Sequence, residues 1–160
     1  MTAETGSRTT TVTLPTDEQI LITRTFDAAP HLVYRALTTP ELVSRWWPAG
    51  LDGIISIDID LRVGGVWRYA IVADDGTEVA LHGEYREVVP CERLVFTEVW
   101  DDRPAAEALV TVTLTPAHGT TSVARLAQFH NVQDRDEHLQ RMQYGLQAAM
   151  ALFEQIVLSL

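Results

Sequence analysis

The chain has 160 residues, of which 46% are hydrophobic and 21% are charged, and this length and composition are typical of one domain with a sizeable core. The formal net charge is −10, and all 12 cationic residues are arginine. Schiff-base chemistry and Walker-type phosphate binding both need a lysine amine, so the sequence excludes both. An acidic surface repels phosphate backbones, and we therefore expect no nucleic-acid partner.

The sequence shows no pattern of export or membrane insertion. Its apolar runs are far shorter than the roughly 20 residues of a membrane span, so we expect no membrane partner and a cytoplasmic location. Cys91 is the only cysteine, which excludes an intrachain disulfide and a thiolate-rich metal site. Residues 1–17 are predicted to be a disordered N-terminal segment, followed by a single folded domain over residues 18–160.

The first predicted elements are one strand and two short helices. Residues 19–27 alternate with the period of two that is typical of a strand. Pro30 begins a helical stretch over residues 31–37, because the fixed φ of proline suits the first turn of a helix. Residues 39–41 repeat this start signal, and the second short helix must end near Pro48.

Six further strands and one long helix complete the predicted order. The short turns between the strands make them antiparallel neighbours, because parallel crossovers need about a dozen residues. A capping pattern of Asp134 and Glu137 indicates the start of the C-terminal helix, whose apolar positions recur every three or four residues. The predicted strands are 54–60, 66–72, 78–89, 93–100, 109–115 and 121–129.

This order predicts an α+β fold in which a curved antiparallel sheet of about seven strands wraps the long C-terminal helix. One helix fills the concave side of a twisted sheet incompletely, so the gap is either packed with large side chains or left as a cavity. Trp67 and Tyr69 share one strand face, and Phe96 and Trp100 share another. Aromatic residues at strand spacing are usually core, and at this point both alternatives stay open.

Two charged residues favour a cavity over a filled core. Glu98 lies among the inward positions of its strand, and Arg125 lies between Val123 and Ala127 on the last strand. An unpaired buried charge costs several kcal/mol, so the two side chains should pair or meet water if both point inward. A β-bulge that turns either of them outward is the alternative.

Motifs along nearly the whole chain resemble one known family. They are TFDAAP (25–30), VYRALT (33–38), PE (40–41), WWP (46–48), DLRVGGVW (60–67), HGEY (82–85), ERLVFT (92–97) and GTT (119–121). This set resembles the activator of heat-shock-protein-90 ATPase homologue family, of the START-like, polyketide-cyclase-like (SRPBCC) superfamily. The resemblance begins at about residue 20 and keeps the order of the family's motifs.

The resemblance implies a helix-grip fold with a hydrophobic cavity between the sheet and the C-terminal helix. The family's last helix commonly carries Gly-Trp, whereas here Gly145 is followed by Leu146, and the loss of the indole should enlarge or reshape the cavity. If the family's pattern holds, the loop of residues 48–53 is the expected gate, because Gly50 and Gly53 free its backbone.

Few kinds of chemistry fit the sequence. The five histidines form no ligand pair on a helix and no serine lies in a nucleophile-elbow motif, so we expect no metal, no cofactor and no nucleophilic catalysis. Acid–base catalysis stays open, with Glu98, His82, Tyr85 and Arg125 as candidates, because burial raises the pKa of a carboxyl toward neutrality. Strict alternation places His82 on the outer face, however, with Glu84.

The sequence therefore predicts binding of a small hydrophobic molecule, lipid-like or polycyclic, in the cavity. Two less favoured alternatives are a cavity enzyme of the cyclase or dehydratase type and a chaperone-interacting protein that acts through its surface. Homodimerisation through a strand edge or the acidic helix face is compatible with the sequence, which does not decide it. The expected cavity residues are Trp47, Trp67, Tyr69, Tyr85, Phe96, Glu98, Trp100, Arg125, Met142 and Leu146.

Overall fold

A computed structural model describes residues 9–48 and 52–160, and within them it has eight strands and four helices. The strands are β1 (Thr11–Thr13), β2 (Gln19–Phe26), β3 (Ile54–Ile59), β4 (Val66–Val72), β5 (Glu78–Val89), β6 (Arg93–Trp100), β7 (Ala108–Ala117) and β8 (Thr120–Gln128). The helices are α1 (Pro30–Thr38), α2 (Pro40–Trp46), α3 (Val132–Gln143) and α4 (Leu146–Ser159). The strands form one antiparallel sheet in the order β1-β2-β8-β7-β6-β5-β4-β3, which confirms the predicted α+β, helix-grip architecture.

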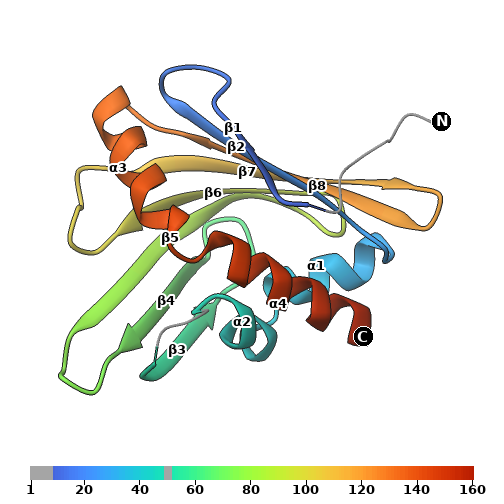
Figure 1. The fold of residues 1–160 in the computed structure, drawn as a ribbon, viewed down its shortest axis with the longest axis horizontal. Coiled ribbons are helices and arrows are strands. Elements are labelled where there is room, and N and C mark those ends of the chain that lie inside the picture. Colours follow the sequence, from blue (N-terminus) through green and yellow to red (C-terminus); the bar gives the residue numbers. More distant parts are fainter. Residues whose placement is uncertain (1–8, 49–51) are drawn as a thin grey trace.

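The register of the strands gathers apolar side chains on one face of the sheet. Side chains alternate between the two faces along each strand, so residues that pair directly share a face. Tyr69 of β4 pairs with Leu81 of β5, and Tyr85 of β5 pairs with Phe96 of β6. The face that these pairs share is the concave face, on which the helices lie (Figure 1).

Helix α4 crosses the concave side of the sheet, with α1 and α2 beside it (Figure 1). Its buried residues are Phe153, Ile156 and Val157, all in its C-terminal half. The ring of Phe153 meets the ring of Phe26 on β2 at 5.1 Å and that of Trp46 on α2 at 5.2 Å, both edge-on. These contacts fix one end of α4 against the sheet and the short helices.

The long C-terminal helix predicted from the apolar spacing is divided into α3 and α4. Gly145 separates them with φ −129° and ψ −6°, outside the helical region, and glycine is the ordinary residue least suited to a helix interior after proline. The start of this helical segment also differs from the predicted start at Asp134. The side-chain oxygen of Asn131 caps α3 by accepting a hydrogen bond from the Asp134 N–H at 2.8 Å. No helix in the described residues is long and apolar enough to cross a membrane.

Strand β1 lies in the segment predicted to be disordered. Its central residue, Val12, pairs with Ile22 of β2, and the hydroxyl of the neighbouring Thr10 accepts a hydrogen bond from Arg24 Nη1 at 3.0 Å. Three residues are too few to show a period of two, and the prediction therefore missed this edge strand. Residues 1–8 lie outside the described residues, so disorder there stays a prediction.

Gly83 of β5 allows a close approach between three strands. A Cβ atom at this position would lie 1.7 Å from the Thr97 carbonyl oxygen of β6 and 2.7 Å from Nε1 of Trp67 on β4. The indole N–H of Trp67 donates a hydrogen bond to the same carbonyl oxygen at 3.2 Å. The missing side chain of Gly83 thus lets Trp67 lie across β5 and form the floor of the concave face.

We expect Gly83→Ala to lower the free energy of unfolding by about 2 kcal/mol or more, because the added methyl group forces β6 or the Trp67 indole to move. Chemical denaturation measures this change. Gly76→Ala is the matched control, since its Cβ would meet nothing within 4 Å and only the left-handed φ of 88° opposes it, at roughly 1 kcal/mol. Equal losses in the two variants would contradict the close approach.

Candidate functional site

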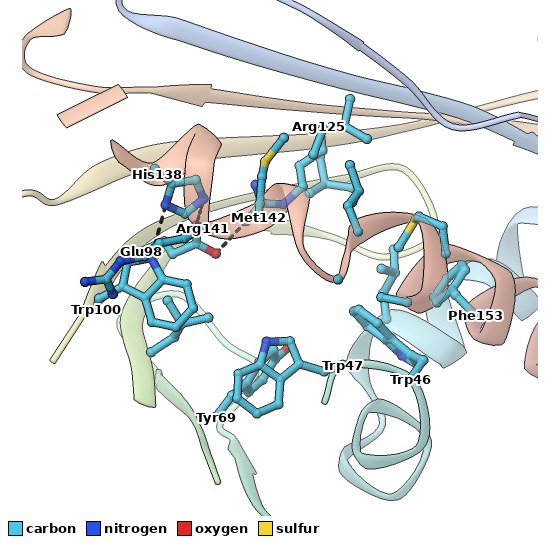
Figure 2. Close-up of a pocket in the computed structure, with 18 of the residues that line it drawn as sticks. Trp46, Trp47, Tyr69, Glu98, Trp100, Arg125, His138, Arg141, Met142 and Phe153 are labelled. Carbon is cyan, nitrogen blue, oxygen red and sulfur yellow. Dashed lines mark hydrogen bonds and ion pairs between the residues drawn. The ribbon is translucent and has the colours of Figure 1, made fainter. Parts of the chain in front are cut away.

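A pocket of about 960 Å³ lies between the concave face of the sheet and helices α3 and α4. Aromatic, aliphatic and charged side chains face one open space from several elements (Figure 2). The structure places all ten expected cavity residues on its walls, namely Trp47, Trp67, Tyr69, Tyr85, Phe96, Glu98, Trp100, Arg125, Met142 and Leu146. Their contact with a ligand stays a prediction.

One wall of the pocket is a set of mutually packed aromatic rings. The ring of Tyr69 lies 4.9 Å from Trp67 and 5.5 Å from Trp47, and the ring of Phe96 lies 5.6 Å from Trp67 and 5.9 Å from Tyr85. Each such edge-on or tilted contact contributes about 1 kcal/mol beyond simple burial, so the wall holds its shape. Burial raises the pKa of Tyr69 and of Tyr85 above the usual 10.0, and both phenols stay neutral.

The opposite wall is aliphatic and comes from the two C-terminal helices. Met142 lies near the end of α3, Leu146 begins α4, and Met150 follows one turn later. Methionine is unbranched and adapts its shape to what it contacts, whereas the aromatic wall is rigid. The pocket therefore pairs a rigid aromatic surface with a deformable aliphatic one.

Glu98 and Arg125 both point into the pocket and form an ion pair there. Arg125 Nη2 donates to Glu98 Oε2 at 2.5 Å, with 7% of the glutamate side chain and 27% of the arginine side chain exposed. The register is regular at both positions, so no bulge turns either residue outward. The strand alternation was therefore a sound guide to these two residues.

His138 of α3 completes the polar end of the pocket. The indole N–H of Trp100 donates a hydrogen bond to His138 Nδ1 at 3.2 Å, so in the neutral ring the proton is on Nε2. His138 Nε2 lies 3.7 Å from Glu98 Oε1. Burial lowers the pKa of His138 first, and the nearby charges of Arg125 and Arg141 lower it further, against the opposite effect of Glu98.

Two buried polar atoms among the described residues have no hydrogen-bond partner, Glu98 Oε1 and Arg24 Nε. Arg24 also lines the pocket, and its Nη2 pairs with Glu154 of α4 at 3.2 Å. A buried acceptor without a donor costs about 1–3 kcal/mol, so it is uncommon in native structures unless it has a use. Glu98 Oε1 is therefore the acceptor at the polar end that protein groups leave unsatisfied.

The structure keeps His82 away from this site. His82 lies on the outer face, as the alternation predicted, where its Nδ1 is 2.7 Å from Asp101.

The expected gate of residues 48–53 includes 49–51, which lie outside the described residues. In the described part of the chain, no three His, Cys, Asp or Glu side chains gather as the ligands of a metal ion would.

The sequence carried an incomplete signal for two further pocket residues. Arg24 alternates with Ile22 and Phe26 on β2, and this pattern alone indicates an inward arginine. His138 belongs to the apolar stripe of the helix, but its contact with Trp100 depends on the direction of α3, which no local pattern encodes. Neither was among the ten expected residues.

Comparison with known proteins gives a family and several solved relatives. The family model described as activator of Hsp90 ATPase homolog 1-like protein matches residues 27–157. A Rhodobacter sphaeroides protein has a TM-score of 0.84 at 24% identity, over 94% of this chain and 99% of its own. A Chromobacterium violaceum protein has a TM-score of 0.71 at 25% identity, over 89% and 98%. A Mycobacterium smegmatis protein has a TM-score of 0.79 at 19% identity, over 94% and 98%. No curated protein matches the sequence.

We expect the free energy of unfolding of His138→Asn to fall less between neutral pH and mild acid than that of the native protein. Because folding lowers the pKa of His138, the stability that its neutral form provides is full above the unfolded value of about 6.5 and is lost as the pH falls from there toward the folded pKa. Urea denaturation between about pH 7.5 and pH 5 measures this slope, with His31→Asn as a control at an exposed histidine. A variant slope identical to that of the native protein would contradict the burial of a neutral His138.

Proposed function

The chain belongs to the family described as activator of Hsp90 ATPase homolog 1-like protein, and from this premise we propose that it binds a small, mainly hydrophobic molecule between the sheet and helices α3 and α4. The observation that carries the proposal is the pocket of about 960 Å³ with one aromatic and one aliphatic wall. Small-molecule sites typically have 300–1,000 Å³, mostly apolar walls and a few placed polar groups.

A filled core does not account for this space. Protein interiors are packed like organic crystals and hold few voids larger than a water molecule. Here Trp47, Phe96 and Leu146 are only partly buried although they face the inside of the fold. Covering such apolar surface stabilises a complex by about 25 cal/mol per Å². Each ring that an apolar ligand covers therefore makes its binding more favourable.

The polar end gives the ligand an orientation. The Glu98–Arg125 pair and His138 lie at one end of the pocket, whereas Phe153 and Trp46 lie at the other (Figure 2). A ligand that lies between them would place its polar group against the charged pair and its apolar part along the aromatic wall. Lipid-like and polycyclic molecules both fit this division.

One observation favours the alternative of a cavity enzyme. The Glu98 carboxylate is 7% exposed and lies among aromatic rings, the setting in which a carboxyl acts as an acid or a base. A molecule extracted from the native protein decides between binding and catalysis. If it returns unchanged after prolonged incubation with fresh protein, the pocket only binds it, whereas a product would show turnover.

We expect the native protein to bind the uncharged dye Nile red and Leu146→Trp to bind it at least about fivefold more weakly, or roughly 1 kcal/mol. The indole of the variant would enter the pocket between the two walls. Gln147→Trp places the same side chain on the exposed face of α4, one residue away, and should leave the affinity unchanged. A fluorescence titration measures all three proteins. Failure of the native protein to bind the dye, or equal weakening in both variants, would overturn the proposal.

A further inference from the structure

The polar end of the pocket presents a hydrogen-bond acceptor and a donor side by side. The acceptor is Glu98 Oε1, a buried atom for which the described residues provide no hydrogen bond. The donor is the Nε2–H of His138, because the Trp100 indole occupies the other ring nitrogen of the histidine. The two atoms are 3.7 Å apart, too far for a direct hydrogen bond between them.

We propose, on the basis of the binding function above, that this end recognises the hydroxyl group of an otherwise apolar, ring-containing ligand, a phenol or an alcohol. A hydroxyl oxygen both donates and accepts, and hydrogen bonds of about 2.7–2.9 Å would join it to both atoms across the 3.7 Å separation. Its hydrogen satisfies Glu98 Oε1, and its lone pair accepts the hydrogen of His138 Nε2.

Other polar groups fit this pair of atoms less well. A carboxylate would lie against the carboxylate of Glu98 in a desolvated site, where like charges repel strongly. A ketone accepts a hydrogen bond but donates none, and it leaves Glu98 Oε1 unsatisfied. An ammonium group satisfies Glu98 but meets the guanidinium of Arg125, which already neutralises that carboxylate at 2.5 Å.

The surrounding rings favour a flat ligand behind the hydroxyl. Trp100 lies beside Glu98, Tyr69 and Trp47 lie together farther from it, and Phe153 lies at the other end of the space (Figure 2). Tyr69 and Trp47 meet at 5.5 Å with an interplanar angle of 65°, and both line the space. A fused aromatic skeleton can therefore lie along this wall while its hydroxyl reaches the polar end.

Three pyrene derivatives test the hydroxyl group with the ring system held constant. We expect the native protein to bind 1-hydroxypyrene about 10- to 100-fold more tightly than 1-methylpyrene, because a hydrogen bond to a charged group is gained. The anion 1-pyrenecarboxylate should bind more weakly than the methyl compound. Competition with Nile red measures all three affinities near pH 7, where 1-hydroxypyrene is a neutral phenol.

The paired variant Glu98→Leu with Arg125→Met removes both charges together and leaves no lone buried ion. It should bind 1-methylpyrene as the native protein does and lose the preference for 1-hydroxypyrene. His138→Phe, which removes only the donor, should lose part of that preference. A control change at the outer-face His82→Phe should keep it.

The outcomes separate the two proposals. If 1-methylpyrene and 1-hydroxypyrene bind with equal affinity to the native protein, hydroxyl recognition is overturned while binding in the pocket stands. If the paired variant folds and keeps the full preference, the hydroxyl contacts another group and the inference also fails. If the native protein binds Nile red but none of the three pyrenes, the inference about a ring-containing hydroxyl ligand fails while binding in the pocket stands. If it binds neither the dye nor the pyrenes, the proposed binding function itself falls.

Discussion

The contact of Phe153 with Phe26 and Trp46 sets the position of α4, and the shape of the interior depends on it. Phe153 is 2% exposed, and its ring meets one ring from the sheet and one from α2. Because this anchor lies in the C-terminal half of α4, the half that begins at Leu146 faces the pocket instead. A helix is only about 10–12 Å across, so it cannot fill a concave eight-stranded sheet alone. The open space follows from where the helix is held.

Two arginines that line this space each pair with a glutamate of another element. Glu98 of β6 pairs with Arg125 of β8, and Arg24 of β2 pairs with Glu154 of α4. Loss of one partner would leave a buried charge at a cost of several kcal/mol, yet replacement of a whole pair by apolar residues is often neutral or stabilising. Stability alone therefore does not explain why Glu98 and Arg125 face the pocket. The proposed recognition of a polar group on a ligand gives the pair a role that stability does not.

The predictions from sequence succeeded where a short period repeats and failed where direction in space matters. The alternation along β4 and β6 identified the inward aromatic residues and the inward Glu98. The helical period of the last segment continues through Gly145, so it could not show that the helix ends there. Strand β1 is too short for a period, and His138 reaches Trp100 only because of the angle between two helices.

The break at Gly145 accounts for the undetected end of α3 and for the position of His138 in the pocket. A helix rises 1.5 Å per residue, so an unbroken helix would carry His138 roughly 22 Å along the α4 axis from Phe153. The break instead lets α3 turn toward the ends of β6 and β7 (Figure 1), where His138 accepts the hydrogen bond of Trp100 and lies beside Glu98. The next residue, Leu146, lines the space below α4. One glycine thus brings the histidine to the polar end, and the leucine after it forms part of the pocket wall.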